Sequence, residues 1–290
     1  MGVPYVDVVF SGLSVASLAG ALHLTERGFR VVVVEALGEV ALRGMYAVAP
    51  FDVQTRSSGS AFEDGCVEII RKRGSVVLYD SAAHALEGRH CRTTTARGDI
   101  IESRVLVYAP SGLRDNPPRQ WNLDPYYGRT VSMCAWSDAP FWEGRDAVVL
   151  GRGGFPIDQA LICAKIGIKV SLLAPEILAP SYLAPDLRDA SRIRPFPGAV
   201  ITRVTATEAG VDVDFHTPRG GDQVVPADVL FFSYLTGTYE ELHQHARACP
   251  GRVFICGVPN GIDLLDTRAQ YQDGIRLATE LLSVLAPRQV

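Results

Sequence analysis

The sequence has no marked excess of charge of one sign and no long run of lysine or arginine. Its 290 residues include 28 basic and 32 acidic side chains, which give a net charge of −4. Nucleic-acid-binding domains concentrate positive charge on one face or along one helix. The sequence therefore does not indicate a nucleic-acid partner, and we expect none.

Long apolar stretches are also lacking. The longest apolar runs, such as residues 31–34, fall far short of the roughly 20 residues that a membrane-spanning helix needs. The N-terminus enters a strand pattern directly, without the basic region and long apolar stretch of a signal peptide. We therefore predict neither a membrane segment nor a secretory leader.

None of the cysteines is spaced as a metal ligand would be. In a chain of this length, scattered cysteines are typical of buried thiols in a reducing compartment. We predict a cytoplasmic protein without a bound metal. The six cysteines are Cys66, Cys91, Cys134, Cys163, Cys249 and Cys256.

What the sequence does contain is material for a large core, with 47% hydrophobic and 21% charged residues. The clearest unit comes first. Residues 6–10 form an apolar strand, 11–17 a tight turn, 18–27 a helix rich in small residues, and 29–34 a second apolar strand that closes on Glu35. A strand, turn, helix and strand with an acid at the end predict a βαβ dinucleotide-binding unit.

The turn of this unit has lost most of its glycines. Gly12 is present, but Ser14 and Ser17 stand where the second and third glycines of the motif are expected. A side chain at Ser14 would crowd a pyrophosphate, so the pattern predicts the fold more strongly than the ligand. Glu35 is either the acid that holds a ribose hydroxyl pair or a solvated acid at the end of a strand.

A second βαβ unit follows at residues 147–173. Its strand covers 147–150, its turn 151–156 and its helix 157–166. The first two glycines are retained, but Pro156 replaces the small third residue. Since no arginine pair follows the last strand to bind the 2′-phosphate of NADPH, we expect no NADPH.

The order of the parts predicts an α/β protein of two Rossmann-like, three-layer dinucleotide-binding domains. The linker candidate is residues 115–118, and the strand at 252–258 with the helix at 267–285 completes the first lobe. The second domain is therefore expected to be inserted into the first. The predicted domains are 1–116 with 246–290, of the FAD-binding type, and 117–245, of the NAD(P)-binding type.

The stretch from Val131 to Trp142 carries the main functional signal. It contains Cys134, then Ser137 three residues later, then Asp138. Together with both βαβ units and the terminal strand and helix, this stretch resembles the low-molecular-weight thioredoxin reductases and the related dithiol oxidases of natural-product biosynthesis. The resemblance covers essentially the whole chain and implies a homodimer with FAD.

The resemblance is incomplete at the places that contact the flavin. Cys134 matches the first cysteine of the family's Cys-x-x-Cys motif and Asp138 matches its acid, but Ser137 replaces the second cysteine. The family's Gly-Asp near the C-terminus, whose aspartate holds the flavin, is Gly257-Val258 here. With Gly12, Ser14, Glu35 and Gly257 as the cofactor-contacting positions, FAD is possible but its motif is degraded.

The remaining residues support limited chemistry. Cys134 is either a lone nucleophile, with Asp138 as proton shuttle, or a buried remnant, and Asp138 is otherwise a helix N-cap. Trp136 and Trp142 would wall an apolar pocket or anchor a domain interface. Cys256 would form a couple with Cys134 or would be one more buried strand cysteine.

Three functions stay open. The leading hypothesis is a divergent thioredoxin-reductase-like enzyme that acts on a small molecule of secondary metabolism in the cleft between the lobes, through Cys134 and Asp138 and without NADPH. The second is an FAD-dependent thiol or dithiol oxidase. The third is a catalytically silent binding or scaffold partner.

Overall fold

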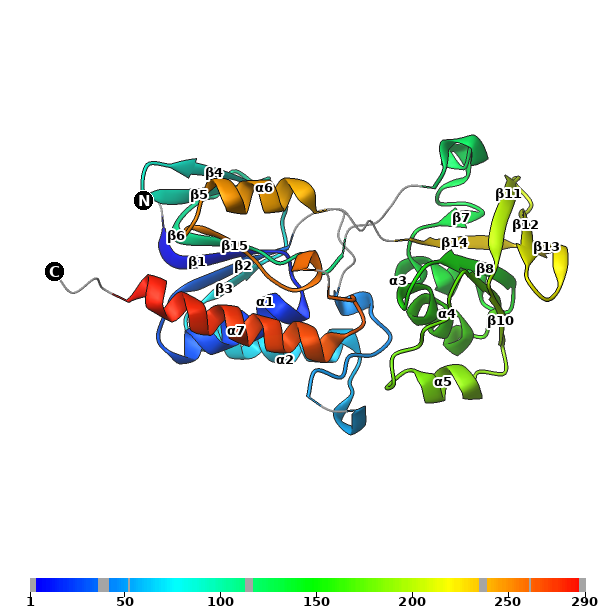
Figure 1. The fold of residues 1–290 in the computed structure, drawn as a ribbon, viewed down its shortest axis with the longest axis horizontal. Coiled ribbons are helices and arrows are strands. Elements are labelled where there is room, and N and C mark those ends of the chain that lie inside the picture. The colour runs from blue at the N-terminus through cyan, green and yellow to red at the C-terminus, as the bar shows by residue number, and fades with distance from the viewer. Residues whose placement is uncertain are drawn as a thin grey trace. The chain divides into compact units, whose positions relative to one another are not determined.

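The computed structural model describes residues 4–35, 42–51, 53–112, 117–234, 239–260 and 262–286. The chain divides into two compact units, shown as ribbons in Figure 1. Unit 1 comprises Met1–Arg43, Val48–Leu113 and Gly237–Val290, and unit 2 comprises Gly44–Ala47 and Arg114–Thr236.

These bounds differ from the predicted domain limits in two places. Helix α6 (Glu240–Ala248) lies mostly within residues assigned by prediction to the inserted domain, but it is part of unit 1, where it packs on the terminal strand. The segment Gly44–Ala47 is part of unit 2, although the residues on both sides of it belong to unit 1. Of the predicted linker, Asp115 and Asn116 lie outside the described residues.

Unit 1 is built on a largely parallel sheet with the order β3-β2-β1-β6-β5-β4, and β15 pairs with β6. Every residue of β2 is buried, as expected for a central strand covered on both faces. The parallel strands are β1 (Tyr5–Ser11), β2 (Val31–Val34), β3 (Val76–Leu78), β6 (Ile100–Tyr108) and β15 (Val253–Ile255), and the antiparallel pair is β4 (Ala82–Glu87) and β5 (His90–Thr95).

Three helices cover one face of this sheet: α1 (Val15–Glu26), α2 (Gly59–Lys72) and α7 (Thr267–Leu285) (Figure 1). The backbones of α1 and α7 approach closely at Gly274, where an added Cβ atom would lie 2.2 Å from the carbonyl oxygen of Ala16. Only glycine permits this contact. Short 3₁₀ turns occupy Leu42–Gly44, Val53–Thr55 and Val258–Asn260.

Unit 2 contains a five-stranded parallel sheet of order β10-β9-β8-β14-β7 and a three-stranded antiparallel sheet of order β11-β12-β13. Phe215 and Leu230 belong to the apolar core of this unit. The strands are β7 (Val131–Ser132), β8 (Asp146–Gly151), β9 (Lys169–Ala174), β10 (Ile193–Pro197), β11 (Val200–Ala206), β12 (Val211–Thr217), β13 (Gly221–Ala227) and β14 (Val229–Ser233).

The longest described helix of unit 2 is α4 (Phe155–Ile166), which follows β8. Its Pro156 packs where β8 ends. A Cβ atom on Gly151 would lie 2.7 Å from Pro156, so the glycine makes room for the proline that replaces the small third residue of the motif. The other elements are α3 (Ala135–Asp138), α5 (Ala184–Asp189) and the 3₁₀ turns Arg119–Trp121, Asp124–Tyr126 and Ala139–Trp142.

Within the described ranges, no helix combines the length and the apolar character that crossing a bilayer would require.

Candidate active site around Cys134

Cys134 stands at the N-cap position of α3, directly after the short edge strand β7. Its backbone N–H donates to Ser132 Oγ at 2.9 Å, and the Ser132 hydroxyl donates to Asp138 Oδ2 at 2.7 Å. The N–H of Asp138 donates back to the Cys134 carbonyl at 3.1 Å. Ser132 therefore ties the predicted nucleophile and the predicted acid into one hydrogen-bonded turn.

Ser137, which replaces the second cysteine of the family motif, is exposed on the same turn. Its hydroxyl donates to the Cys134 carbonyl at 3.3 Å. The structure thus places Cys134, Ser137 and Asp138 on one turn. Ser132 was not predicted, although its position two residues before Cys134 could have indicated it.

The other five cysteines are buried, whereas Cys134 is half-buried. Burial raises the pKa of the Cys66 and Cys163 thiols to about 12. It also raises the pKa of Cys256, which is fully buried beside Gly257. Since the thiolate is the reactive form, Cys256 is a poor nucleophile, and Cys134 is the thiol most open to reagents.

The two predicted pocket tryptophans differ in exposure. Trp136 is 50% exposed and packs against Gly44, where a Cβ atom would lie 3.2 Å from the Trp136 Cβ and Cγ atoms. Trp142 is partly buried at the end of a 3₁₀ turn. Between them Phe141 is 83% exposed. The turn that carries Cys134 is therefore followed by an aromatic surface.

A buried polar pair on α4 contacts this turn and was not predicted from the sequence. Gln159 Oε1 accepts the N–H of Ala135, the residue after Cys134, at 2.8 Å. Gln159 Nε2 in turn donates to Asp158 Oδ2 at 3.3 Å. Both residues are buried, with 3% and 0% of their surface exposed. A signal was present, because Asp158 and Gln159 interrupt an otherwise apolar helix sequence.

The turn before α1 in unit 1 is capped by its own serines. Ser14 Oγ accepts the N–H of Ser17 at 3.1 Å, and Ser17 Oγ accepts the N–H of Ser14 at 2.8 Å. This capping box satisfies amides at the N-terminus of α1, and both serines are fully buried. A phosphate oxygen at such a helix end would compete with the Ser14 and Ser17 hydroxyls for these amide N–H groups.

Two other predicted flavin contacts in unit 1, Gly12 and Gly257, make close contacts within the protein itself. Gly12 has a φ of +114°, and an added Cβ atom would lie 2.4 Å from the Ala109 carbonyl oxygen. The Gly257 N–H donates to Asp273 Oδ2 at 2.8 Å. Asp273 thus places a carboxylate beside Gly257, the residue before Val258.

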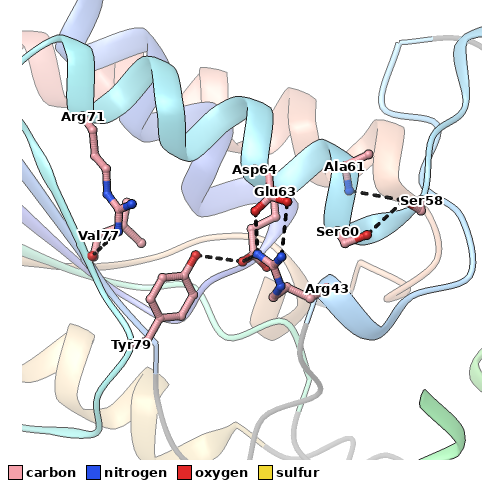
Figure 2. Close-up of polar contacts among 9 residues, drawn as sticks. All are labelled: Arg43, Ser58, Ser60, Ala61, Glu63, Asp64, Arg71, Val77 and Tyr79. Atoms are coloured by element: carbon pink, nitrogen blue, oxygen red, sulfur yellow. Dashed lines mark hydrogen bonds and ion pairs between the residues drawn. The ribbon is translucent and has the colours of Figure 1, made fainter. Parts of the chain in front are cut away.

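Glu35 lies half-buried after β2, near a second acid. Burial and the negative charge of Glu63 raise the pKa of Glu35. Glu63 is fully buried on α2, where its Oε1 accepts from Arg43 Nη1 at 2.8 Å and from the Tyr79 hydroxyl at 2.9 Å (Figure 2). Arg43 also binds Asp64 at 2.7 Å. A ribose at Glu35 would therefore meet a carboxyl whose charged form is disfavoured.

The turn of unit 2 differs from that of unit 1. Arg152 is exposed and Gly153, with a φ of +73°, is partly exposed. The N-cap of α4 is Gly154, and within the described part of the chain no side chain caps the helix there. Among the described residues, no group of three histidine, cysteine or acidic side chains could hold a metal ion.

The fold is that of the two-domain thioredoxin reductases. Over almost the whole chain it resembles Lactococcus lactis thioredoxin reductase with a TM-score of 0.78 and 16% identity, covering 97% of this chain and 99% of the other. For T. acidophilum thioredoxin reductase the TM-score is 0.76, with 15% identity and 96% and 98% covered. The bacillithiol disulfide reductase of Staphylococcus aureus gives 0.67, with 15% identity and 97% and 99% covered. These likenesses confirm the predicted fold class.

Sequence comparisons find the same kind of resemblance. An alkyl hydroperoxide reductase component of Staphylococcus epidermidis is 25% identical over 236 residues, 79% of this chain and 46% of the relative. The thioredoxin reductase of Listeria innocua is 21% identical over 172 residues, 58% of this chain and 52% of the relative. The chain thus spans about half the length of these curated relatives. No family model matches the sequence. The predicted thioredoxin-reductase-like resemblance is confirmed.

Proposed function

We propose that the protein is a divergent thioredoxin-reductase-like enzyme that exchanges the thiol and disulfide groups of a small molecule through Cys134, without NADPH. The observation that carries this proposal is the hydroxyl of Ser132, which connects the backbone of Cys134 to the carboxylate of Asp138 on one half-buried turn. The resemblance to natural-product dithiol oxidases supports a biosynthetic intermediate as substrate, and a homodimer as the assembly.

The chemistry requires one cysteine and no external electrons. The Cys134 thiolate attacks a disulfide R–S–S–R, forming a Cys134–S–S–R bond while the S–S bond of the substrate breaks and RS⁻ leaves. Asp138 receives the Cys134 proton and passes it to the leaving thiolate. A second thiol R′–SH then attacks the mixed disulfide, forms R–S–S–R′ and returns Cys134 to its thiol. The sum is an exchange, with no net oxidation.

The first test counts reactive thiols with the aromatic disulfide 4,4′-dithiodipyridine. We expect one fast-reacting thiol per native chain, located at Cys134 by mass spectrometry, and none in Cys134→Ala. Asp138→Asn should slow the reaction about a hundredfold if it transfers the proton. Asp146→Asn, the same change at an exposed acid of unit 2, is the matched control and should react at the wild-type rate.

The visible spectrum of the purified protein distinguishes the alternatives. A colourless protein that takes up no added FAD supports exchange without flavin. A yellow protein that releases stoichiometric FAD on denaturation would replace this proposal with an FAD-dependent thiol oxidase. If Cys134 does not react while the fold is intact, a silent binding partner becomes the better description.

A further inference from the structure

The segment Gly44–Ala47 is anchored in unit 2 by a buried carboxylate. The Tyr46 N–H donates to Asp158 Oδ1 at 2.8 Å, and the Ala47 N–H stabilises the same carboxylate. Next to this anchor, Gly44 lies against Trp136, and Lys165 Nζ lies 5.7 Å from the centre of the Tyr46 ring. Hydrogen bonds from its backbone N–H groups to Asp158, as well as its side-chain contacts, therefore hold the segment in place.

The second oxygen of the Asp158 carboxylate determines how Gln159 is oriented. An ionised carboxylate only accepts hydrogen bonds, so the Gln159 amide must turn its NH₂ group toward Asp158 Oδ2 and its carbonyl toward the N–H of Ala135. That N–H belongs to the first residue of α3 and has no acceptor within the helix. Gln159 thus caps the Cys134 turn from a neighbouring helix.

Protonation of Asp158 reverses this requirement. A proton on Oδ2 makes that oxygen a donor, which pairs with the Gln159 carbonyl instead of its NH₂ group. The amide then presents its NH₂ group to the N–H of Ala135, where two donors face each other and the bond is lost. Oδ1 can still accept the N–H of Tyr46, so the segment remains docked while the Cys134 turn is released.

The environment of Asp158 places this change near neutral pH. Burial raises its pKa to about 7, against the opposing effect of the hydrogen bonds from Tyr46, Gln159 and Ala47. Within the described ranges, no charged neighbour contributes to this pKa shift. The titratable groups on the elements packed against α4 are Asp138 of α3, Asp146 of β8, Lys169 of β9, Arg194 of β10, and Asp186, Arg188 and Asp189 of α5, with Tyr46 on the segment and Lys165 and Cys163 on α4 itself.

From this geometry we propose that Asp158 and Gln159 are positioning residues that hold the Cys134 turn when Asp158 is ionised and release it when Asp158 is protonated. This inference rests on the proposed function for its consequence, because it describes the regulation of the same cysteine. The hydrogen-bond switch itself does not depend on whether Cys134 is catalytic.

The test is the amide exchange of Ala135, measured by NMR as a protection factor between pH 5.5 and 8.5. In the native protein we expect protection to rise about fivefold to tenfold through pH 7, the effect of one hydrogen bond. Asp158→Asn imitates the protonated acid and should keep protection low at every pH. Gln159→Leu should do the same, with a wild-type circular dichroism spectrum as the check on folding. Flat protection in the native protein would overturn the proposal without any variant.

A kinetic measurement separates this inference from the proposed function. At pH 8 the rate of Cys134 with 4,4′-dithiodipyridine, per thiolate, should be about fivefold lower in Asp158→Asn than in the native protein. At pH 6 the two rates should agree. A protection change at Ala135 with an unreactive Cys134 would leave the switch in place and refute the proposed exchange. Equal rates at pH 8, with a reactive Cys134, would refute the positioning role.

Discussion

The two units each contain a buried acid on a helix that packs on the parallel sheet, and the two acids are stabilised in different ways. In unit 1, Glu63 faces the guanidinium of Arg43 and the hydroxyl of Tyr79. In unit 2, Asp158 receives backbone and amide N–H groups, and its pKa is raised to about 7. The buried acid of unit 1 is thus paired with a cation, whereas the buried acid of unit 2 is held by neutral donors and has a raised pKa.

The two dinucleotide-type turns also differ, in the side chains that cap the helices after them. The turn before α1 is capped by the hydroxyls of Ser14 and Ser17, which are fully buried. The turn before α4 has Gly154, which offers no capping side chain, at its N-cap and an exposed Arg152 nearby. A shared strand-turn-helix pattern therefore does not imply a shared ligand, because the first helix residues decide which amides remain available.

The largest expected effect is the pH-dependent contribution of Asp158 to stability. Its folded-state pKa of about 7 exceeds the ordinary aspartate value of 3.8, so the folded state binds the proton more tightly than the unfolded state. The stabilisation is full below pH 4 and is lost as pH rises through 7. At 1.36 kcal/mol per pKa unit, the loss is on the order of 4 kcal/mol.

Thermal unfolding of the native protein and of Asp158→Asn at pH 5 and pH 8 measures the part of this loss that falls between pH 5 and pH 7, about 3 kcal/mol. The asparagine cannot ionise, so the difference in unfolding midpoint between the two proteins should change in favour of the variant at pH 8. A difference that is the same at both pH values would mean that Asp158 is not titrating in the folded protein.

The next effect concerns the cation in unit 1. Arg43→Met leaves the Glu63 carboxylate buried without its charged partner. We expect this loss to cost about 3 kcal/mol of folding stability. This is the lower end of the range for a buried pair, because the Arg43 side chain is 41% exposed. Urea unfolding should show this as a lower midpoint. The double variant Arg43→Met/Glu63→Leu should recover most of the loss, since it removes both charges.

An exposed ion pair provides the matched control. Lys72 and Glu68 on α2 form a pair with side chains 72% and 64% exposed. Lys72→Met should leave the urea midpoint almost unchanged, because the pair is exposed to solvent. If Arg43→Met changed the urea midpoint as little as Lys72→Met, Arg43 would not stabilise the buried Glu63. The contrast between the two buried acids would then disappear.

Local patterns predicted the fold well. The strand, turn, helix and strand of each unit and the terminal helix, predicted and found at Thr267–Leu285, follow from apolar periodicity and turn residues. The docking of Gly44–Ala47 on Asp158 joins residues 112 positions apart. No local pattern indicates such a contact, because it depends on tertiary packing. The Cys134 turn was predictable because its parts are close in sequence, whereas the Gln159 cap was not.

The smallest expected effect tests the closed turn of unit 1. Ser14→Ala removes an N-cap hydroxyl and should cost about 1 kcal/mol. In a reciprocal capping box each hydroxyl serves the other residue's amide, so the losses in Ser14→Ala and Ser17→Ala should not add. A double-mutant cycle by urea unfolding should give a coupling of at least about 0.5 kcal/mol. Additive losses would show that the two serines act independently. The two hydroxyls would then cap α1 as separate hydrogen bonds and not as one coupled unit.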